Sequence, residues 1–517
     1  MSSKTWWDPI GGYAADILSA LAEDPERVVL YWRDQEVSGA RFIGVVAAAY
    51  RAMGELDAGP GSVVGILVEP NSPDMLAARY AAHLRGAAVC YLRTSNPGSN
   101  AAILSADDQL RVLRETGAAV VYTDKENLGL ASGLAKEAGI AVLGPVTGRD
   151  DLVVPDGAEP WDPRRLAVIG YTSGSTGRPK GIRLSGRAWE STVRTAQPPG
   201  QGRTVMLVNT PLSHTVGPMV DGLLLTGATV VLREEFQAGQ FLRDVAELQV
   251  TRSFIATAHL YQLIDHLEEL GNPDFISAQL SSLRLLIYSG TAAAPSRVAR
   301  AARLIGPRLA QVYGTSEGGR VTFLDPGGHF DPWLSTTVGR PFPGVEISVR
   351  DAESAAEVPD GDTGQVWMCS PAMMDGYWND PELSARVLRD GWYATGDTGY
   401  RDDKGYLHLL GRLADVVKVD AVKVHPAVVE AEILTLDGIR QAAVFGRRDE
   451  DSVESLQCAI AFQPGATLTV DDVRAHLREA LSPAHVPQVV DVLDELPLTN
   501  AGKPDKVLLR SRAGTRT

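Results

Sequence analysis

A loop rich in glycine and hydroxyl residues has the composition of an anion-binding loop. Residues 171–181 read Tyr-Thr-Ser-Gly-Ser-Thr-Gly-Arg-Pro-Lys-Gly and follow an apolar strand expected over 166–170. Glycines let backbone N–H groups approach an anion closely, and serine and threonine add donors. Lys180 adds a compact positive charge suited to phosphate. The spacing is not that of a Walker loop. We predict a phosphate-binding loop whose members include Thr172, Ser173, Gly174, Ser175, Thr176 and Gly177.

Further short motifs follow this loop in a fixed order. They are Ile-Tyr-Ser-Gly-Thr-Ala at 287–292, Val-Tyr-Gly-Thr-Ser-Glu at 312–317, Gly-Trp-Tyr-Ala-Thr-Gly-Asp at 391–397, Gly-Tyr-Leu at 405–407, Gly-Arg at 411–412 and Leu-Pro-Leu-Thr-Asn-Ala-Gly-Lys at 496–503. Each motif alone is weak, since an isolated Gly-Asp is usually a turn and an exposed lysine is usually solvated. Their order and spacing together resemble the acyl-adenylate-forming superfamily: acyl- and aryl-CoA synthetases, nonribosomal adenylation domains and firefly-type luciferases.

The resemblance implies that the chain binds ATP and Mg²⁺. Tyr313 would stack near adenine, Ser316 would hydrogen-bond the AMP phosphate, and Glu317 would hold Mg²⁺. Asp397 would accept both ribose hydroxyls, and Arg412 would also touch the ribose. The same resemblance implies further nucleotide-binding positions at Ser289, Gly290, Thr291, Gly314 and Thr315, and a second metal-binding position at Thr172.

The implied reaction is attack of an acid on the α-phosphate of ATP, with release of pyrophosphate. Such a reaction needs positioning and charge stabilisation more than covalent help. Mg²⁺ on Glu317, the loop with Lys180, and Lys503 would supply the stabilisation. By resemblance, Lys503 reaches into the site during adenylation, where it would bridge the attacking oxygen and the α-phosphate. Catalytic roles are therefore expected for Lys503, Glu317 and Lys180.

The substrate pocket is expected beside His214, Ser289 and Val312. His214 lies where the family often has an aromatic residue or histidine next to the bound acid; a purely structural loop histidine is the alternative. Val312 stands where a glycine can open a tunnel for long acyl chains. Because valine is bulkier, we expect a short or aromatic acid.

Three departures from the family pattern follow Arg412. Ala414 replaces the usual Asp or Lys of the hinge, Ala421 replaces the glycine of Lys-x-x-Gly, and Val428 replaces a glutamate. In CoA ligases that glycine lets the pantetheine arm pass close to the backbone. One interpretation is that adenylation survives while transfer to CoA is weak or absent; neutral drift is the other.

The acid and its acceptor are therefore left open. The acceptor is CoA, the phosphopantetheine of a carrier protein, or an amine, in bacterial secondary metabolism. An alternative is an ATP-dependent diazotase that activates nitrite and passes the nitrosyl group to an aromatic amine. A second alternative is a non-catalytic nucleotide-binding relative, which the intact Lys180, Glu317, Asp397, Arg412 and Lys503 disfavour.

The composition excludes several classes of protein. The net charge of −15 argues against nucleic acid or an anionic membrane surface as the main partner. No run of ~18 apolar residues offers a membrane span, and the richest stretch, 223–232, is interpreted as a buried strand. Cys90, Cys369 and Cys458 form neither a disulfide framework nor a zinc pattern. A cytoplasmic location is expected. The oligomeric state is left open.

The elements expected around these motifs indicate an α/β fold. Short apolar strands at 63–68, 87–92 and 118–122 alternate with helical segments at 72–85 and 107–116, which predicts βαβ units and a largely parallel sheet. The same rhythm resumes with strands at 204–207, 229–232, 253–255 and 285–288. From about residue 331 the sequence changes to short strands and turns, which predicts a β-rich subdomain. We predict an N-terminal ATP- and acid-binding domain over 1–412 and a small mobile α+β domain over 413–517 that carries Lys503.

Overall fold

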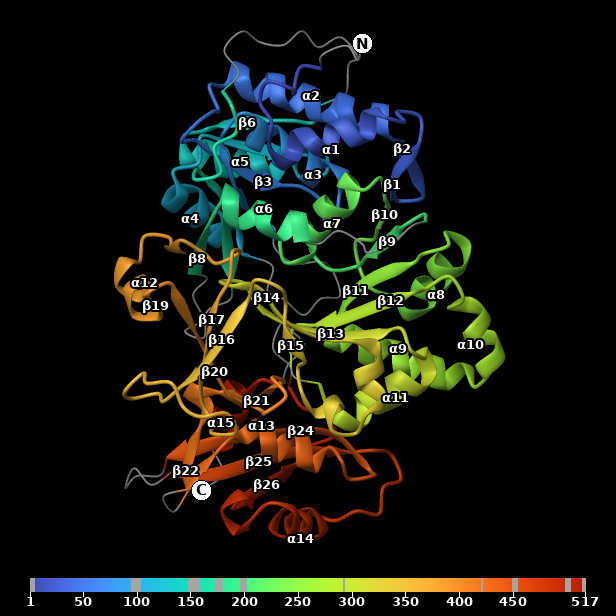
Figure 1. The fold of residues 1–517 in the computed structure, drawn as a ribbon, viewed down its shortest axis with the longest axis vertical. Helices are drawn as coiled ribbons and strands as arrows, with labels where there is room; N and C mark the ends of the chain where they lie inside the picture. The colour runs from blue at the N-terminus through green and yellow to red at the C-terminus, as the bar shows by residue number, and fades with distance from the viewer. Residues whose placement is uncertain are drawn as a thin grey trace.

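The computed structural model describes residues 5–93, 104–146, 159–172, 180–195, 202–291, 293–419, 422–448, 454–497 and 504–513. A large α/β domain forms the upper and middle parts of the molecule, and a smaller α+β domain lies below it (Figure 1). The fold class predicted from the sequence is therefore confirmed.

The first large sheet carries the glycine-rich loop at one end of a strand. Its order is β18-β8-β7-β4-β3-β5-β6, and β7, β4, β3, β5 and β6 are parallel. The strands are β3 (Val63–Leu67), β4 (Ala88–Tyr91), β5 (Val120–Thr123), β6 (Ala141–Leu143), β7 (Leu166–Thr172), β8 (Lys180–Ser185) and β18 (Gly376–Tyr377). The predicted strands and βαβ rhythm of this region are confirmed.

The second large sheet has the order β15-β14-β13-β12-β11-β9-β10-β1-β2, with a parallel centre from β13 to β1. Its strands are β1 (Val28–Trp32), β2 (Gln35–Ser38), β9 (Val205–Val208), β10 (Thr229–Leu232), β11 (Arg252–Ala256), β12 (Leu285–Ser289), β13 (Leu309–Thr315), β14 (Gly319–Leu324) and β15 (Arg340–Pro341). Two strands from the start of the chain therefore complete a sheet built mostly from its middle.

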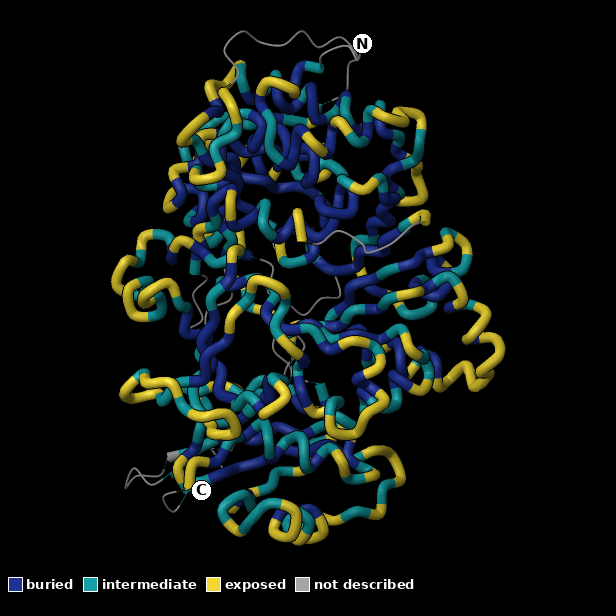
Figure 2. Tube along the Cα trace, viewed as in Figure 1, coloured by how far each residue is buried: buried dark blue, intermediate teal, exposed yellow. Residues whose placement is uncertain are grey.

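Helices fill the space between the two large sheets and cover their outer faces. One hydrophobic core joins the two sheets through α1 (Gly12–Ala22), α2 (Gly39–Glu55), α3 (Pro73–Leu84), α6 (Gly186–Thr195) and α7 (Val216–Leu225). Two further cores cover the outer faces, with α4 (Ala106–Thr116) and α5 (Leu128–Ala138) on the first sheet and α8 (Ala238–Glu247), α9 (Thr257–Leu270), α10 (Pro273–Gln279) and α11 (Pro295–Ile305) on the second. In Figure 2 the strands at the centre are buried and the exposed segments lie mainly at the periphery.

The interpretation of residues 223–232 as one buried strand is wrong in part. Helix α7 continues to Leu225, and only Thr229–Leu232 form a strand. Both parts are buried, Leu223, Leu224 and Val230 among them. An apolar run that is buried on all sides carries no periodicity that separates helix from strand. No helix among the described residues is long and apolar enough to cross a bilayer.

A buried ion pair links α3 and α7 in the shared core. The side chains of Arg79 and Asp221 are both fully inaccessible to solvent. The same carboxylate accepts hydrogen bonds from Tyr80 Oη and, at 3.0 Å, from Trp189 Nε1. Arg79 also donates to Tyr91 Oη at 3.0 Å. Because Trp189 belongs to α6, this network fixes the relative positions of three helices.

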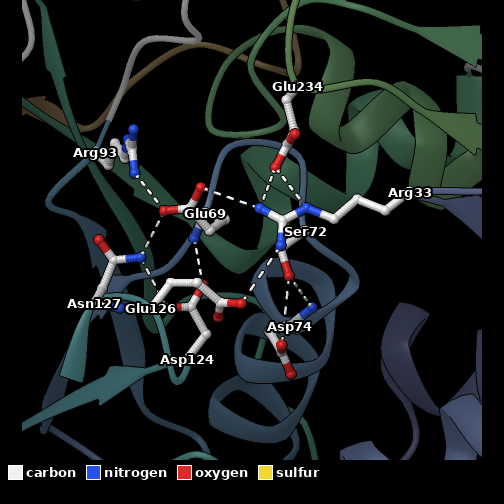
Figure 3. A network of polar contacts seen from close by, with 9 residues as sticks. All are labelled: Arg33, Glu69, Ser72, Asp74, Arg93, Asp124, Glu126, Asn127 and Glu234. Carbon is white, nitrogen blue, oxygen red and sulfur yellow. Dashed lines mark hydrogen bonds and ion pairs between the residues drawn. The ribbon is translucent and has the colours of Figure 1, made fainter.

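A second polar network lies where the two large sheets meet (Figure 3). Arg33, just after β1, pairs with Glu234, just after β10, and with Glu69, just after β3. Arg93 donates to the same Glu69 at 2.8 Å. Parallel strands of one sheet end at the same edge, so the network joins the carboxyl ends of strands from both sheets.

The β-rich subdomain and the small domain follow. The subdomain contains β16 (Glu346–Arg350), β17 (Gly364–Cys369), β19 (Leu388–Arg389), β20 (Trp392–Arg401), β21 (Leu407–Arg412) and α12 (Pro381–Val387). The small domain contains β22 (Val417–Val419), β23 (Val422–Val424), β24 (Ile439–Arg448), β25 (Glu454–Phe462), β26 (Val489–Val492), α13 (Pro426–Ile433), α14 (Val470–Ala480) and α15 (Lys506–Ala513). It touches the large domain through Thr398 and His425, whose Oγ1 and Nδ1 are 3.2 Å apart.

Candidate active site

Three of the predicted nucleotide-binding residues form one hydrogen-bonded group. Asp397 on β20 and Arg412 on β21 are cross-strand partners in the antiparallel ladder. The Asp397 carboxylate accepts a hydrogen bond from Tyr313 Oη at 2.6 Å and forms an ion pair with Arg412 Nε at 3.1 Å. Arg412 Nη1 also donates to the carbonyl of Thr395 at 3.0 Å. Residues separated by 84 positions in the sequence are thus brought together.

This group is built to present a fixed carboxylate. Asp397 is 7% exposed. Burial, and next the negative charge of Asp397, raise the pKa of Tyr313 well above its usual range. Tyr313 therefore stays protonated and donates at any ordinary pH. A carboxylate oxygen can accept more than one hydrogen bond, so the chemistry of Asp397 suits the ribose hydroxyls that the family resemblance assigns to it.

The turn between β13 and β14 places Ser316 and Glu317. A Cβ on Gly314 would lie 2.7 Å from the carbonyl oxygen of Gly319, so the closing of this hairpin requires glycine at 314. Glu317 Oε1 accepts a hydrogen bond from Tyr377 Oη at 2.9 Å. Lys180 Nζ lies 5.9 Å from the centre of the Tyr377 ring. The structure therefore gathers Glu317 and Lys180 around Tyr377, a residue that the sequence analysis did not identify.

The surroundings of Glu317 fit a magnesium ion that is carried largely by nucleotide phosphates. Its second carboxylate oxygen has no partner among the described residues. Among the residues that the structure describes, no group of three or more His, Cys, Asp or Glu could hold a metal ion. Mg²⁺ is commonly bound through one or two carboxylates plus phosphates, so one carboxylate suffices. A bound ion would neutralise charge on the phosphates.

The residues predicted to bind nucleotide at 289–291 form a turn directly after β12. Thr257 Oγ1 lies 3.2 Å from the carbonyl oxygen of Ser289 and 3.1 Å from that of Thr291. Gly290 between them has a φ of 105°, a conformation that favours glycine. Hydrogen bonds from Thr257, the first residue of α9, thus hold this turn in place.

A cavity opens next to these groups. Its described lining contains Val168, Gly170, Tyr171, Ile182, Leu184, Ala188, Trp189, Thr192, Ser213, His214, Thr215, Pro218, Thr315, Ser316, Gly319, Arg320 and Ala372. Much of this wall is apolar or aromatic, while Ser316 and Thr315 come from the motif predicted to bind AMP. Small-molecule sites commonly combine an apolar wall with a few polar groups. His214 is part of this lining, whereas Ser289 and Val312 are not; Val312 is 4% exposed within β13.

Some predicted residues fall outside the described structure. These are Ser173, Gly174, Ser175, Thr176, Gly177, the side chain of Thr172, Ala421 and Lys503. Their roles stay predictions. Arg320, Trp189 and Tyr377 are the residues near the site that sequence reasoning missed. Only Arg320 had a signal in the local sequence, since it follows the 312–317 motif after Gly318 and Gly319.

His214 should control the low-pH behaviour of the reaction. His214 lines the cavity and is exposed there, while desolvation by the surrounding protein lowers the pKa of its imidazole. The imidazole is therefore mostly neutral at pH 7, and half-protonation should be reached only below the ordinary value of about 6.5. We expect the overall rate to fall at low pH with a midpoint below 6.5.

The His214→Asn variant should lose this acid limb and be slower by roughly tenfold, the worth of one hydrogen bond. The measurement is the pH–rate profile of both proteins. His266→Asn on α9 is the control and should keep the wild-type limb. An acid limb that is unchanged in His214→Asn would show that another group titrates.

Comparison with known proteins agrees with this geometry. Residues 18–378 match the family described as AMP-binding enzyme, and residues 428–503 match the AMP-binding enzyme C-terminal domain. The chain belongs to the AMP-binding enzyme family. Members of this acyl-adenylate-forming superfamily use ATP to form an adenylate, and the chain is accordingly an AMP-forming ligase.

Relatives of this AMP-binding enzyme differ in their acceptors. It is 29% identical to the medium/long-chain-fatty-acid–CoA ligase FadD8 of Mycobacterium tuberculosis, over 96% of this chain and 89% of that protein. The chain is 32% identical to a feruloyl-CoA synthase of an Amycolatopsis species, over 88% of this chain and 89% of that protein. Among solved structures, the amide bond synthetase McbA from Marinactinospora thermotolerans is 35% identical with a TM-score of 0.85, covering 97% of this chain and 99% of that one.

Proposed function

We propose that this enzyme adenylates a small carboxylic acid, aromatic or short, and transfers the acyl group to an amine to form an amide. The observation that carries the first step is the shared cavity: Ser316 and Thr315 lie in the same lining as Trp189 and Tyr171. An acid held against the aromatic wall would thus lie next to residues expected at the AMP phosphate. The aromatic and apolar lining, and the valine at position 312 where a glycine can open a tunnel for long chains, favour a compact acid.

In the first step a carboxylate oxygen attacks the α-phosphorus of ATP, and pyrophosphate leaves. Lys180, Glu317 with Mg²⁺, and Lys503 would stabilise the charge that gathers around the phosphorus. Asp397, Tyr313 and Arg412 would hold the ribose. In the second step the amine nitrogen attacks the acyl carbon, the C–O bond to AMP breaks, and the amine loses a proton. Neutral His214 is the group in the cavity lining suited to accept that proton.

An amine is supported as acceptor by two independent observations. The amide bond synthetase McbA is similar over nearly the full length of both chains. In addition, Ala421 replaces the glycine that the pantetheine arm passes in CoA ligases, next to the negative charge of Asp420. CoA is the second candidate, supported by the relatives named as CoA ligases. The relatives favour a carboxylate over nitrite as the activated acid.

The test is acid-dependent ATP–pyrophosphate exchange, followed by product analysis. Purified enzyme with Mg²⁺ is offered aryl and short-chain carboxylates and nitrite. The best acid is then incubated with ATP and either CoA or a panel of amines, and products are identified by mass spectrometry. Exchange with a carboxylate and an amide product would support the proposal. Rapid thioester formation would overturn the choice of acceptor, exchange with nitrite alone would favour the diazotase, and ATP binding without pyrophosphate release would favour a non-catalytic protein.

Restoring the glycine should increase CoA transfer. We expect Ala421→Gly to raise the rate of thioester formation roughly tenfold or more, because it removes a methyl group from the expected path of the pantetheine arm. Thioester formation is measured with the best acid, ATP and CoA. Ala355→Gly, on a surface turn where Ala355 has a φ of 58°, is a matched control and should change nothing in this assay. Equal rates in wild type and Ala421→Gly would count against steric exclusion of CoA.

A further inference from the structure

Among the described residues that line the cavity, one carries a permanent charge. Within its described lining, Arg320 is the only lysine, arginine, aspartate or glutamate. The side chain starts at the second residue of β14, directly after the turn that carries Ser316 and Glu317. A single cationic group in an otherwise uncharged lining favours a ligand that carries a negative charge.

Arg320 is held in place without being neutralised. Its Nη2 donates to Thr195 Oγ1 at 2.7 Å, and its guanidinium carbon lies 4.8 Å from the centre of the Phe342 ring. It forms no ion pair with any acid that the structure describes. Burial lowers the pKa of Arg320 from its usual value. Residues 196–201, which follow Thr195, read Ala-Gln-Pro-Pro-Gly-Gln and contain no acid either.

Two other arginines with little solvent exposure are paired with acids. Arg79 is paired with Asp221, and Arg233 with Asp244 at 2.6 Å. Arg412, predicted to contact the nucleotide, is also paired, with Asp397, although its side chain is 59% exposed. A desolvated guanidinium without a counter-charge is unfavourable. Arg320 is therefore suited to an anion that arrives from outside the chain.

We propose that Arg320 binds a second anionic group on the acid substrate. The substrate class is then a small acid with two anionic groups, for example an aryl or short-chain dicarboxylate, of which one carboxylate is adenylated and the other pairs with Arg320. This inference rests on the proposed adenylation of a small carboxylate and specifies its substrate. Guanidinium and carboxylate match in geometry, and the aromatic wall accommodates the body that joins the two groups.

The test compares acids that differ only in the second carboxylate. Isophthalate is paired with benzoate, and glutarate with butyrate, in wild type, Arg320→Leu and Arg320→Lys. Apparent KM and kcat for ATP–pyrophosphate exchange are measured, and the binding of isophthalate and benzoate is measured separately by calorimetry. Arg164→Leu is the control, because the Arg164 side chain is 88% exposed.

Wild type and the control should prefer the dicarboxylate of each pair. Arg320→Leu should reduce this preference roughly 10- to 100-fold, mainly through KM, as expected for a lost hydrogen-bonded charge, and Arg320→Lys should recover part of it. Equal preference for both acids in wild type, or an equal loss for both in Arg320→Leu, would overturn the inference even where adenylation is found. If no acid supports exchange, a calorimetric preference for isophthalate that needs Arg320 would support the site while contradicting the proposed function, and its absence would overturn both.

Discussion

Replacing Asp221 with alanine should lower the free energy of unfolding by about 3–5 kcal/mol. The substitution leaves the Arg79 guanidinium charged, with neither side chain of the original pair accessible to solvent. It also removes the acceptor of Tyr80 Oη and Trp189 Nε1. An unpaired buried charge costs far more than the net worth of the pair, which explains the size of the effect. Urea denaturation followed by circular dichroism measures it.

A matched control separates burial from ion pairing as such. Glu268 pairs with Arg300, and both side chains are 35% exposed. Glu268→Ala should change the free energy of unfolding by only about 0–1 kcal/mol, because exposed pairs are screened by water. The double variant Arg79→Met/Asp221→Leu should be more stable than Asp221→Ala, since it leaves no unpaired charge. Equal losses in Asp221→Ala and Glu268→Ala would contradict this account.

Removing the Lys503 side chain should lower the rate of acid-dependent ATP–pyrophosphate exchange roughly 10²–10³-fold, by analogy with the loss of one stabilising group at a developing charge. Lys503 is the predicted bridge between the attacking oxygen and the α-phosphate. The measurement compares kcat for exchange in wild type and Lys503→Ala with saturating ATP and the best acid.

Two further measurements distinguish a catalytic role from a folding defect. Lys423→Ala removes an exposed lysine of the same small domain and should leave exchange unchanged. Transfer from a pre-formed acyl adenylate to the acceptor should remain in Lys503→Ala, because that step involves no attack on phosphorus. A matched loss in both half-reactions, together with a lower melting temperature, would show that the lysine acts on stability.

Local sequence signals predicted much of the fold. The strand at Thr229–Leu232 matches the structure residue for residue, and the strands predicted at 63–68 and 285–288 each differ from the observed strand by one residue. Strands β1 and β2 were not foreseen, because their position at the edge of the second sheet depends on pairing with residues about 200 positions later. Local pattern contains no information about such a partner.

The site shows the same division between local and long-range information. The motif at 312–317 singled out Ser316 and Glu317, which the structure places on one turn, and the ladder between β20 and β21 places Asp397 beside Arg412. Tyr377 reaches Glu317 from 60 residues away, and nothing in its own neighbourhood marks it. The role proposed for Arg320 depends on the lack of an ion-pairing acid among the described residues around it. Only the folded structure reveals this.

The placement of β1 has a consequence for how the protein can be produced. Its pairing with β10, and the contact of Arg33 with Glu234, join residues 28–33 to partners that lie about 200 residues later in the chain. During translation β1 and β2 therefore cannot join the second sheet until β10 has been synthesised. An expression fragment that begins after residue 38 would lack both strands. The two large lobes are therefore a single unit of biosynthesis, and the small C-terminal domain is the better candidate for separate expression.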